Sequence, residues 1–139
     1  MESFRWDQLH EGQSANFAVT LVSAHMDMFR ELSGDCNPLH TEPAFAAESG
    51  FRDVVAFGML TSSFYSQLVG CHLPGRFCVL HGIDVEFVAP AFVGDQLTVS
   101  GSICHKSDAV RRLEIRARIV NQDEKMISRA KIRVGVHGS

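Results

Sequence analysis

Apolar and polar residues alternate along the second half of the chain in a way that predicts four consecutive strands. In four stretches, apolar side chains occupy every second position, and charged or polar side chains occupy most positions between them. These stretches cover residues 83–87, 97–103, 113–119 and 130–134, and turn-forming residues separate them. Period-two patterns with one charged side indicate antiparallel strands that have one buried face and one solvent-facing face.

The first half of the chain predicts one short strand, over Asn16–Leu21, followed by a helix. Ser23 is a candidate N-cap for this helix, and Gly34 is a natural C-terminal stop. Between them, apolar residues recur at helical spacing: Met26, Phe29 and Leu32. A loop is expected to follow through Pro38, with a further helical turn at Pro43–Glu48.

A longer helix is predicted from Phe57 to about Val69, and Gly70 with Pro74-Gly75 is expected to stop it. Apolar residues recur at helical spacing in and just after it: Leu60, Phe64, Leu68 and Cys71. The segment has no charged residue, which indicates a buried helix. An apolar helix followed by four antiparallel strands suggests an α+β fold in which one sheet wraps around one helix. The wet face and the edges of such a sheet invite pairing with a second copy.

Length and composition narrow the class of protein. The 139 residues suit one domain spanning residues 1–139, and 45% hydrophobic residues suit a globular core. A net charge of −3 without a run of Lys or Arg gives little support for binding nucleic acid or an anionic membrane. No apolar stretch reaches the roughly 18 residues of a membrane span, and the charged N-terminus does not resemble a signal peptide.

The cysteines point to a cytoplasmic protein without a metal centre. None of the four has a CxxC neighbour, so a zinc or redox motif is not expected: Cys36, Cys71, Cys78 and Cys104. We interpret them as reduced thiols, most of which fill the core.

The segment from Asp35 to His40 carries the candidate chemistry. Adding water to an enoyl thioester requires a base for the water proton, an acid for the α-carbon and a donor for the developing oxyanion. Asp35 and His40 can supply the acid–base pair, because a loop fixed by Pro38 can direct both side chains at one water. Asn37 can hold this loop by bonding its own backbone. On local grounds alone, Asp35 and Asn37 are equally compatible with an ordinary turn, and His40 with a packed or surface histidine.

Gly58 and Ser66 are the other candidate residues. Gly58 stands at the predicted start of the apolar helix, where free backbone N–H groups and the helix dipole suit an oxyanion. A tight turn entering a helix is the simpler reading of this glycine. Ser66 lies two turns into the helix, where it can bond a substrate or serve only as a small packing residue.

At this point the chain resembles the MaoC-like (R)-specific enoyl-CoA hydratases. The specific part is Asp35-Cys36-Asn37-Pro38-Leu39-His40, because it carries both acid–base positions. Further matches follow in order and cover nearly the whole chain: Pro43–Ala46, Phe57–Leu60, Leu73–Gly75, Phe87–Pro90 and Val93–Asp95.

The resemblance implies a hot-dog fold, a homodimer or dimer of dimers with sites at the subunit interface, and hydration of trans-2-enoyl-CoA to (R)-3-hydroxyacyl-CoA or its reverse. It implies that Asp35 and His40 are the acid–base pair, that the Gly58 N–H binds the thioester oxygen, and that Ser66 is an active-site serine. No metal or organic cofactor is implied. The family usually has His before Gly-Met-Leu, where this chain has Phe57, which is expected to line a more apolar acyl pocket or to accompany a carrier-bound substrate.

Two other functions are compatible with the sequence. A hot-dog acyl thioesterase would direct water at the carbonyl carbon, although such enzymes usually lack the Asn-Pro-x-His spacing. A non-catalytic acyl-thioester-binding subunit would explain Phe57 but not the retention of Asp35 and His40. The acyl chain length and the carrier, coenzyme A or acyl carrier protein, are open at this stage.

Overall fold

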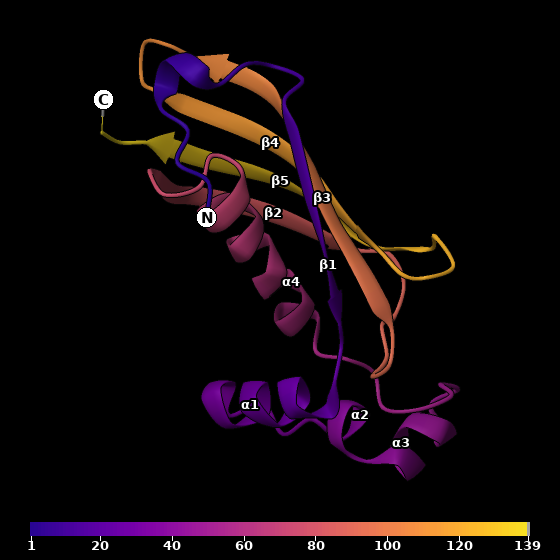
Figure 1. Ribbon diagram of the computed structural model, residues 1–139. Coiled ribbons are helices and arrows are strands. Elements are labelled where there is room, and N and C mark those ends of the chain that lie inside the picture. The colour runs from indigo at the N-terminus through magenta and orange to yellow at the C-terminus, as the bar shows by residue number, and fades with distance from the viewer. Residues whose placement is uncertain (139) are drawn as a thin grey trace.

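A five-stranded antiparallel sheet curves around one helix, as Figure 1 shows. The computed structural model describes residues 1–138. The strands follow the order β1-β3-β4-β5-β2, with bounds β1 (Ser14–Thr20), β2 (Cys78–Phe87), β3 (Gln96–Ser107), β4 (Arg112–Val120) and β5 (Met126–Val136). The predicted arrangement of four consecutive strands wrapped around an apolar helix is confirmed, and β1 extends the sheet by pairing with β3.

The helices lie on one side of this sheet and beyond its end. Their bounds are η1 (Trp6–Gln8), α1 (Ser23–Ser33), α2 (Pro38–Thr41), α3 (Pro43–Glu48), α4 (Gly58–Gln67) and the π-helical turn η2 (Leu68–His72). In Figure 1, α4 lies against the sheet, while α1, α2 and α3 form a separate group next to the N-terminal end of α4. No helix within residues 1–138 is long and apolar enough to cross a membrane.

Three local predictions for the first half are corrected. The first strand is Ser14–Thr20 rather than Asn16–Leu21, because its register with β3 already begins at Ser14. Ser23 is not the N-cap of α1. Val22 holds that position, and its N–H donates to Nδ1 of His25 at 3.1 Å. Leu32 does not share the buried stripe, since it is 85% exposed.

The predicted long helix is correct in place but different at both ends. Phe57 is the N-cap residue of α4 rather than its first turn. Gly70 does not end the helix, which continues as the π-helical turn η2 to His72. The imidazole of His72 stacks on Phe17 of β1, with ring centroids 5.0 Å apart and planes at 13°, and this contact holds the wide turn against the sheet.

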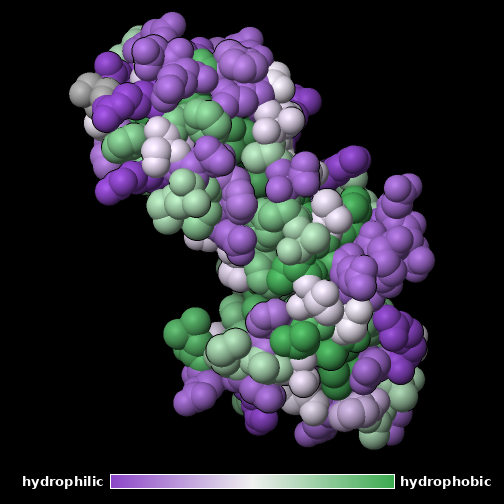
Figure 2. Space-filling view, in the orientation of Figure 1, coloured by the Kyte–Doolittle hydropathy of each residue, from purple (hydrophilic) through white to green (hydrophobic). Residues whose placement is uncertain are grey.

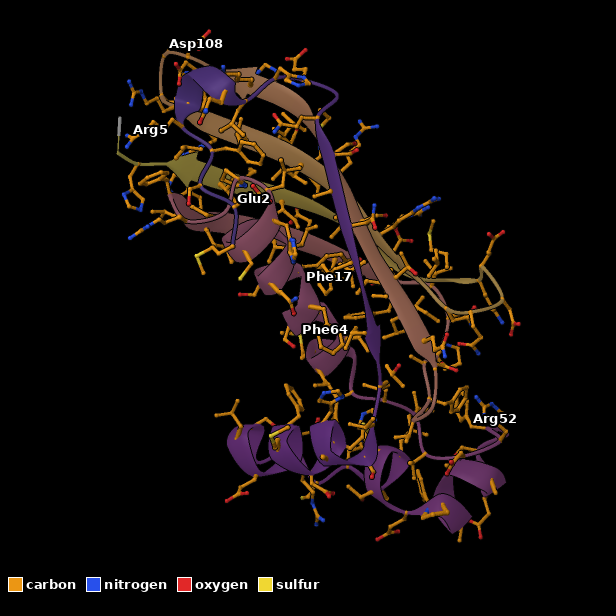
Figure 3. All side chains as sticks on the ribbon, in the orientation of Figure 1. Glu2, Arg5, Phe17, Arg52, Phe64 and Asp108 are labelled. Atoms are coloured by element: carbon orange, nitrogen blue, oxygen red, sulfur yellow. The ribbon has the colours of Figure 1, made fainter. Side chains whose placement is uncertain are left out.

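The core fills the space between α4 and the facing side of the sheet. Its members from the sheet alternate along β3, β4 and β5, as the period-two pattern requires: Leu97, Val99, Ile103, Leu113, Ile115, Ile119, Ile132 and Val134. Figure 3 shows Phe17 and Phe64 in the region between β1 and α4. The hydroxyl of Tyr65 on α4 hydrogen-bonds Ser128 of β5 at 2.8 Å. Burial raises the pKa of Tyr65 to about 12, so the phenol stays neutral.

One side of α4 is left open in the single chain, whereas the sequence indicated a buried helix. Met59 is 68% exposed, and Ser63 and Ser66 are exposed. The neighbouring edge strand β2 exposes Leu80 and Ile83. Figure 2 shows hydrophobic surface continuing from the region of α4 to the helices beyond it. The molecule therefore presents an uncharged helix face beside an unpaired strand edge.

Candidate active site

Gly34 and Asp35 form the turn that leaves α1. Gly34 has φ +74°, the left-handed conformation that glycine adopts most easily at a helix C-terminus. The N–H of Asp35 donates to Oγ of Ser33 at 3.1 Å, and Oδ1 of Asp35 accepts from the N–H of Asn37 at 3.0 Å. The Asp35 side chain is exposed, and one carboxylate oxygen is engaged by this local bond.

Asn37 then begins a second short helix. Its Oδ1 accepts from the N–H of Leu39 at 2.9 Å, and Pro38 occupies the first helical position. The predicted role of Asn37 in holding its own backbone is thus observed. The expected loop ends at Asn37, however, and His40 is the third residue of α2 rather than a loop residue.

The imidazole of His40 is fixed by one hydrogen bond and one ring contact. Its Nδ1 lies 2.7 Å from the carbonyl oxygen of Val55, which can only accept, so Nδ1 carries the proton. In the neutral ring Nε2 is then unprotonated and able to accept a proton. The ring centroid is 4.4 Å from that of Phe57 at an interplanar angle of 32°, and Phe57 in turn lies 4.9 Å from Phe29.

Gly58 is the first residue of α4, so its N–H has no partner within the helix. A Cβ added there would lie 3.0 Å from the ring of Phe87, so this backbone is approached closely by a side chain. Oγ of Thr61 donates to the carbonyl oxygen of Gly58 at 2.9 Å and holds the first turn. The helix dipole adds partial positive charge at this end.

His40 and Gly58 line the same hollow, which has a volume of about 360 Å³. Its other walls are almost all apolar: Phe51, Val55, Ala56, Phe87, Val88, Ala89, Pro90, Ala91 and Ile127, with Thr61 as a polar member. The structure therefore brings together a proton acceptor and a helix N-terminus that are 18 residues apart in the sequence. This juxtaposition suits a reaction that builds charge on a carbonyl oxygen.

The other predicted residues occupy different places. Asp35 lies on the exposed turn just before α2, outside the residues that line this hollow. Ser66 lines a second hollow of about 270 Å³, together with Met59, Leu80 and Ile83. Phe57 is only 2% exposed and packs behind the His40 ring, so within the single chain it does not line the hollow as expected.

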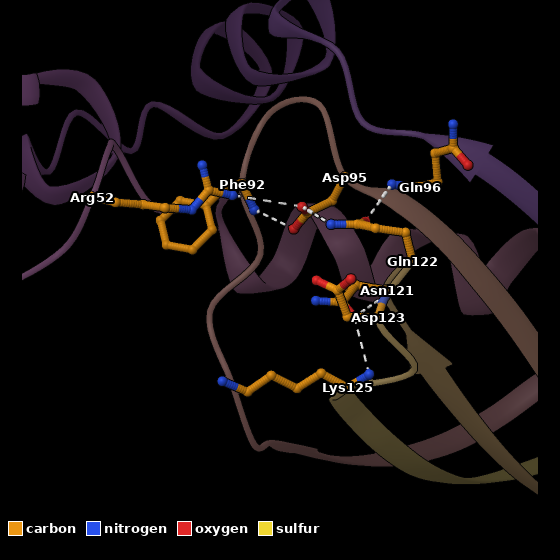
Figure 4. A network of polar contacts seen from close by, with 8 residues as sticks. All are labelled: Arg52, Phe92, Asp95, Gln96, Asn121, Gln122, Asp123 and Lys125. Carbon is orange, nitrogen blue, oxygen red and sulfur yellow. Dashed lines mark hydrogen bonds and ion pairs between the residues drawn. The ribbon is translucent and has the colours of Figure 1, made fainter.

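A polar network at the base of the sheet supports the segment that holds His40 (Figure 4). The buried carboxylate of Asp95 accepts from the N–H of Phe92 at 2.9 Å and from Nε2 of Gln122 at 3.1 Å. Arg52 lies 3.7 Å from this carboxylate, and its guanidinium stacks over the Phe92 ring at 4.0 Å. Sequence reasoning noted Asp95 as part of a family match but did not foresee this support, because Arg52 and Asp95 are joined only by the fold.

Backbone bonds continue from this network to the site. The N–H of Ala56 donates to the carbonyl oxygen of Ala91 at 2.8 Å, and the N–H of Val55 donates to that of Leu39 at 3.1 Å. These two bonds hold the backbone of Val55 and Ala56 in place, and the carbonyl of Val55 in turn orients His40. A backbone carbonyl leaves no side-chain signal in a sequence, so this acceptor could not be found from the residues alone.

Comparison with known proteins identifies the family. The sequence profile of the MaoC like domain family matches residues 7–125. The chain belongs to this family. An (R)-specific enoyl-CoA hydratase of Aeromonas caviae is 41% identical over 90 residues, which cover 65% of this chain and 67% of that protein. A homologous (R)-specific enoyl-CoA hydratase of Rhodospirillum rubrum is 33% identical over 70% of this chain and 68% of its own length.

Solved structures give the same relationship. The (R)-hydratase from A. caviae superposes with a TM-score of 0.88 at 32% identity, covering 93% of this chain and 98% of its own. The R-hydratase PhaJ1 from Pseudomonas aeruginosa superposes with a TM-score of 0.89 at 27% identity, covering 96% and 86%. The MaoC-like resemblance, the hot-dog fold and the hydratase/dehydratase class predicted from the sequence are thereby confirmed.

In this MaoC-like chain, replacing Asp95 is expected to destabilise the fold. Asp95→Ala removes the acceptor of a buried N–H, and such a loss costs about 2–3 kcal/mol. Urea unfolding followed by circular dichroism would measure it. Asp123→Ala, on the exposed turn between β4 and β5, is the matched control and is expected to cost less than about 0.5 kcal/mol. Equal losses for the two variants would contradict the role of Asp95.

Replacing Phe57 is expected to loosen His40 rather than unfold the chain. Phe57→Leu keeps an apolar side chain but removes the ring that contacts the His40 imidazole, a contact worth about 1 kcal/mol. Nitrogen-15 NMR of the histidine rings should then show loss of the single Nδ1–H form of His40, with a fall in kcat of about threefold to tenfold. Phe45→Leu, at a half-exposed position on α3, is the control. An unchanged His40 signal would show that Val55 alone holds the ring.

Proposed function

We propose that this chain adds water to a trans-2-enoyl thioester to give an (R)-3-hydroxyacyl thioester, or removes it, with Asp35 and His40 as the acid–base pair. The observation that carries the proposal is the shared hollow of His40 and Gly58. In it, the N–H of Gly58 is free to bind the thioester oxygen while Nε2 of His40 is free to exchange a proton.

The proposed reaction divides the work between the residues. In hydration, water attacks the β-carbon while one member of the pair removes its proton. Electron density moves through the α-carbon toward the thioester oxygen, where the Gly58 N–H and the dipole of α4 stabilise the negative charge. The other member delivers a proton to the α-carbon. Asn37 positions both residues, because its N–H donates to the Asp35 carboxylate and its side-chain oxygen caps the helix that carries His40.

The apolar walls suit the acyl group. Phe87, Val88 and Ile127 offer no polar group that would compete for the reacting water. Phe57 contributes indirectly by packing on His40. We place Ser66 in the part of the site that is completed when the second hollow meets a partner subunit.

A homodimer, or a dimer of dimers, is the assembly that we propose. The strand β2 stands at one edge of the sheet, so its outer side is not paired within residues 1–138. Next to it, the hollow that contains Ser66 is bounded by apolar side chains of α4, β2 and β5. A second copy that pairs along β2 would cover both the strand edge and the uncharged face of α4.

Breaking this contact is expected to give monomers. Ile83→Glu places a carboxylate on β2 inside the proposed contact, where it would be buried without a partner. Size-exclusion chromatography with light scattering should show half the mass of the wild type, and kcat should fall with it. Val110→Glu, exposed in the turn between β3 and β4, should leave the mass unchanged. A dimer of unaltered mass in Ile83→Glu would place the contact elsewhere.

The remaining conditions follow from the chemistry. The reaction needs no metal or organic cofactor, because backbone and side-chain donors supply the charge stabilisation. The acyl group arrives on coenzyme A or on an acyl carrier protein. We also propose that the whole chain forms one domain and works in the cytoplasm, where its four free cysteines would stay reduced.

The decisive assay mixes the protein with crotonyl-CoA and follows the ultraviolet absorbance of the conjugated enoyl thioester. Loss of absorbance without release of free thiol is expected. Release of thiol, detected with a disulfide reagent, would favour the thioesterase function instead. Tight binding without turnover, on coenzyme A and carrier-protein substrates alike, would favour a non-catalytic acyl-binding subunit.

A further inference from the structure

The hollow that contains Ser66 has one polar wall and one apolar wall. It measures about 270 Å³ and lies between α4 and the strands β2 and β5. The wall on α4 carries four hydroxyl side chains, those of Ser62, Ser63, Tyr65 and Ser66, whereas the strands contribute only aliphatic side chains. No charged side chain of residues 1–138 lines it. We call it the serine hollow.

Ser62 differs from its neighbours in this wall because its hydroxyl has no partner. Oγ of Ser63 donates to the carbonyl oxygen of Leu60 at 2.6 Å, and the phenol of Tyr65 bonds Ser128. Oγ of Ser62 is buried, and within residues 1–138 it is the one buried side-chain oxygen or nitrogen that lacks a hydrogen-bond partner. Such a hydroxyl destabilises the fold, because it has lost its bonds to water without gaining others.

The usual internal partner of a helical serine is already engaged at Ser62. That partner is the carbonyl oxygen four residues earlier, here Gly58, and it accepts from Oγ of Thr61 at 2.9 Å. Rotation about χ1 gives the Ser62 hydroxyl other staggered positions, so it can turn toward a ligand in the serine hollow. The proposed second copy would cover this hollow and exclude water. A partner for Ser62 must then come from a ligand or from that copy.

The serine hollow adjoins the hollow of His40 and Gly58 on the side of the sheet that faces α4. Gly58 and Ser62 are four residues apart on α4, so they are neighbours on one face of the helix with a rise of about 6 Å between them. On β2, Val85 lines the serine hollow, and Phe87, two residues further on the same face of the strand, lines the other. A chain that extends from Gly58 along α4 therefore reaches Ser62.

We propose that Ser62 selects substrates whose acyl chain carries an uncharged oxygen at about the sixth position, counted from the thioester carbon. This inference rests on the proposed function for the position of the thioester at Gly58. An extended chain advances about 3.5 Å over three bonds, so about 6 Å corresponds to five bonds. A hydroxyl both donates and accepts, so an ether, carbonyl or hydroxyl oxygen can bond it. A carboxylate or an ammonium group is disfavoured, because the serine hollow offers no counter-charge.

Two substrates of equal length test this preference. The 5-methoxypent-2-enoyl and hept-2-enoyl thioesters of coenzyme A differ only in an ether oxygen that replaces the methylene group at the sixth position. Ser62→Ala is expected to lower kcat/KM for the methoxy substrate by about threefold to tenfold, the value of one hydrogen bond, and to leave the heptenoyl substrate at the wild-type value. An equal change for both substrates, or for neither, would overturn the proposal.

Two further variants control this experiment. Ser62→Thr keeps the hydroxyl and should retain the wild-type ratio of kcat/KM between the two substrates. Ser14→Ala removes an exposed hydroxyl on β1 and should match the wild type with both. Loss of the preference in Ser62→Thr as well as in Ser62→Ala would show that the shape of the side chain, and not its hydroxyl, sets the ratio, and would overturn the proposal.

Thermal melting separates a partner in the ligand from a partner in the second copy. If the ligand supplies the partner, the free protein keeps an unpaired hydroxyl, and Ser62→Ala is expected to raise Tm by about 4 °C. Differential scanning calorimetry without substrate would measure this shift. An unchanged or lower Tm would mean that Ser62 is already bonded within the assembly, and would overturn the proposal.

If the wild type turns over neither substrate, the proposed function fails while binding still decides the role of Ser62. Isothermal titration calorimetry with the saturated 5-methoxypentanoyl and heptanoyl thioesters of coenzyme A would then compare the wild type with Ser62→Ala. Weaker binding of the methoxy ligand alone would support the proposal. The same change for both ligands, no change, or no binding at all would overturn it.

Discussion

Asp35→Asn and His40→Asn are each expected to lower kcat by about two to four orders of magnitude, the usual contribution of general acid–base catalysis. Neither change should disturb the local fold. In Asp35→Asn, the amide oxygen of the new side chain can still accept from the N–H of Asn37. In His40→Asn, the new amide can still donate to the carbonyl oxygen of Val55. The loss would therefore report on proton transfer.

Initial rates with crotonyl-CoA, with thermal melting in parallel, would measure this effect. Asp27→Asn, an exposed carboxylate on α1, is the matched control and should retain full activity. If Asp35→Asn behaved like Asp27→Asn, the carboxylate of Asp35 would be a turn former only. If His40→Asn alone retained activity, the proton acceptor would have to lie elsewhere in the hollow.

Gly58→Ala is expected to lower kcat/KM by about tenfold to a hundredfold while leaving the free energy of unfolding nearly unchanged. The added Cβ would lie 3.0 Å from Phe87, whose half-exposed ring can give way. The methyl group would then occupy space that the thioester carbonyl needs to approach the backbone N–H, and loss of one oxyanion donor costs up to about a thousandfold.

Two variants distinguish this explanation from a simple packing defect. Phe87→Ala combined with Gly58→Ala relieves the clash but leaves the methyl group in the hollow, so activity should stay low. Gly70→Ala adds a methyl group on the same helical segment where nothing lies within 4 Å, and it should be active. Recovery of activity in the double variant would show that the loss in Gly58→Ala came from the clash with the Phe87 ring and not from blocked approach of the thioester carbonyl.

The sequence predicted the sheet well because its signal is local. Charged and apolar residues alternate along β4 so regularly that the buried face, with Leu113, Ile115 and Ile119, is fixed by the pattern alone. The helices were harder to predict. Leu32 has the helical spacing of an apolar stripe, but it lies on α1 where its side chain stays exposed. Gly70 falls in a π-helical turn, which the local sequence does not predict.

The candidate site was likewise predictable from the sequence only where the contacts are local. Asn37 was predicted to bond its own backbone, and it does so because an Asx side chain reaches only the next few residues. Phe57 was expected to line the acyl pocket, yet it packs behind His40, because its neighbours come from α1 and α2. The roles of Asp35, His40, Gly58 and Ser66 stay predictions, since the single chain brings only His40 and Gly58 into one hollow.

The bond from His40 to Val55 has a consequence for the direction of the reaction. Because Nδ1 of His40 donates to a backbone carbonyl, Nε2 is the ring nitrogen that remains to exchange a proton with a reactant. A proton that enters there from a reactant must leave through the same atom before the next turnover. In its proposed role His40 serves both directions through this one atom, so the net flux through the site follows the ratio of enoyl to hydroxyacyl thioester that the surrounding reactions maintain.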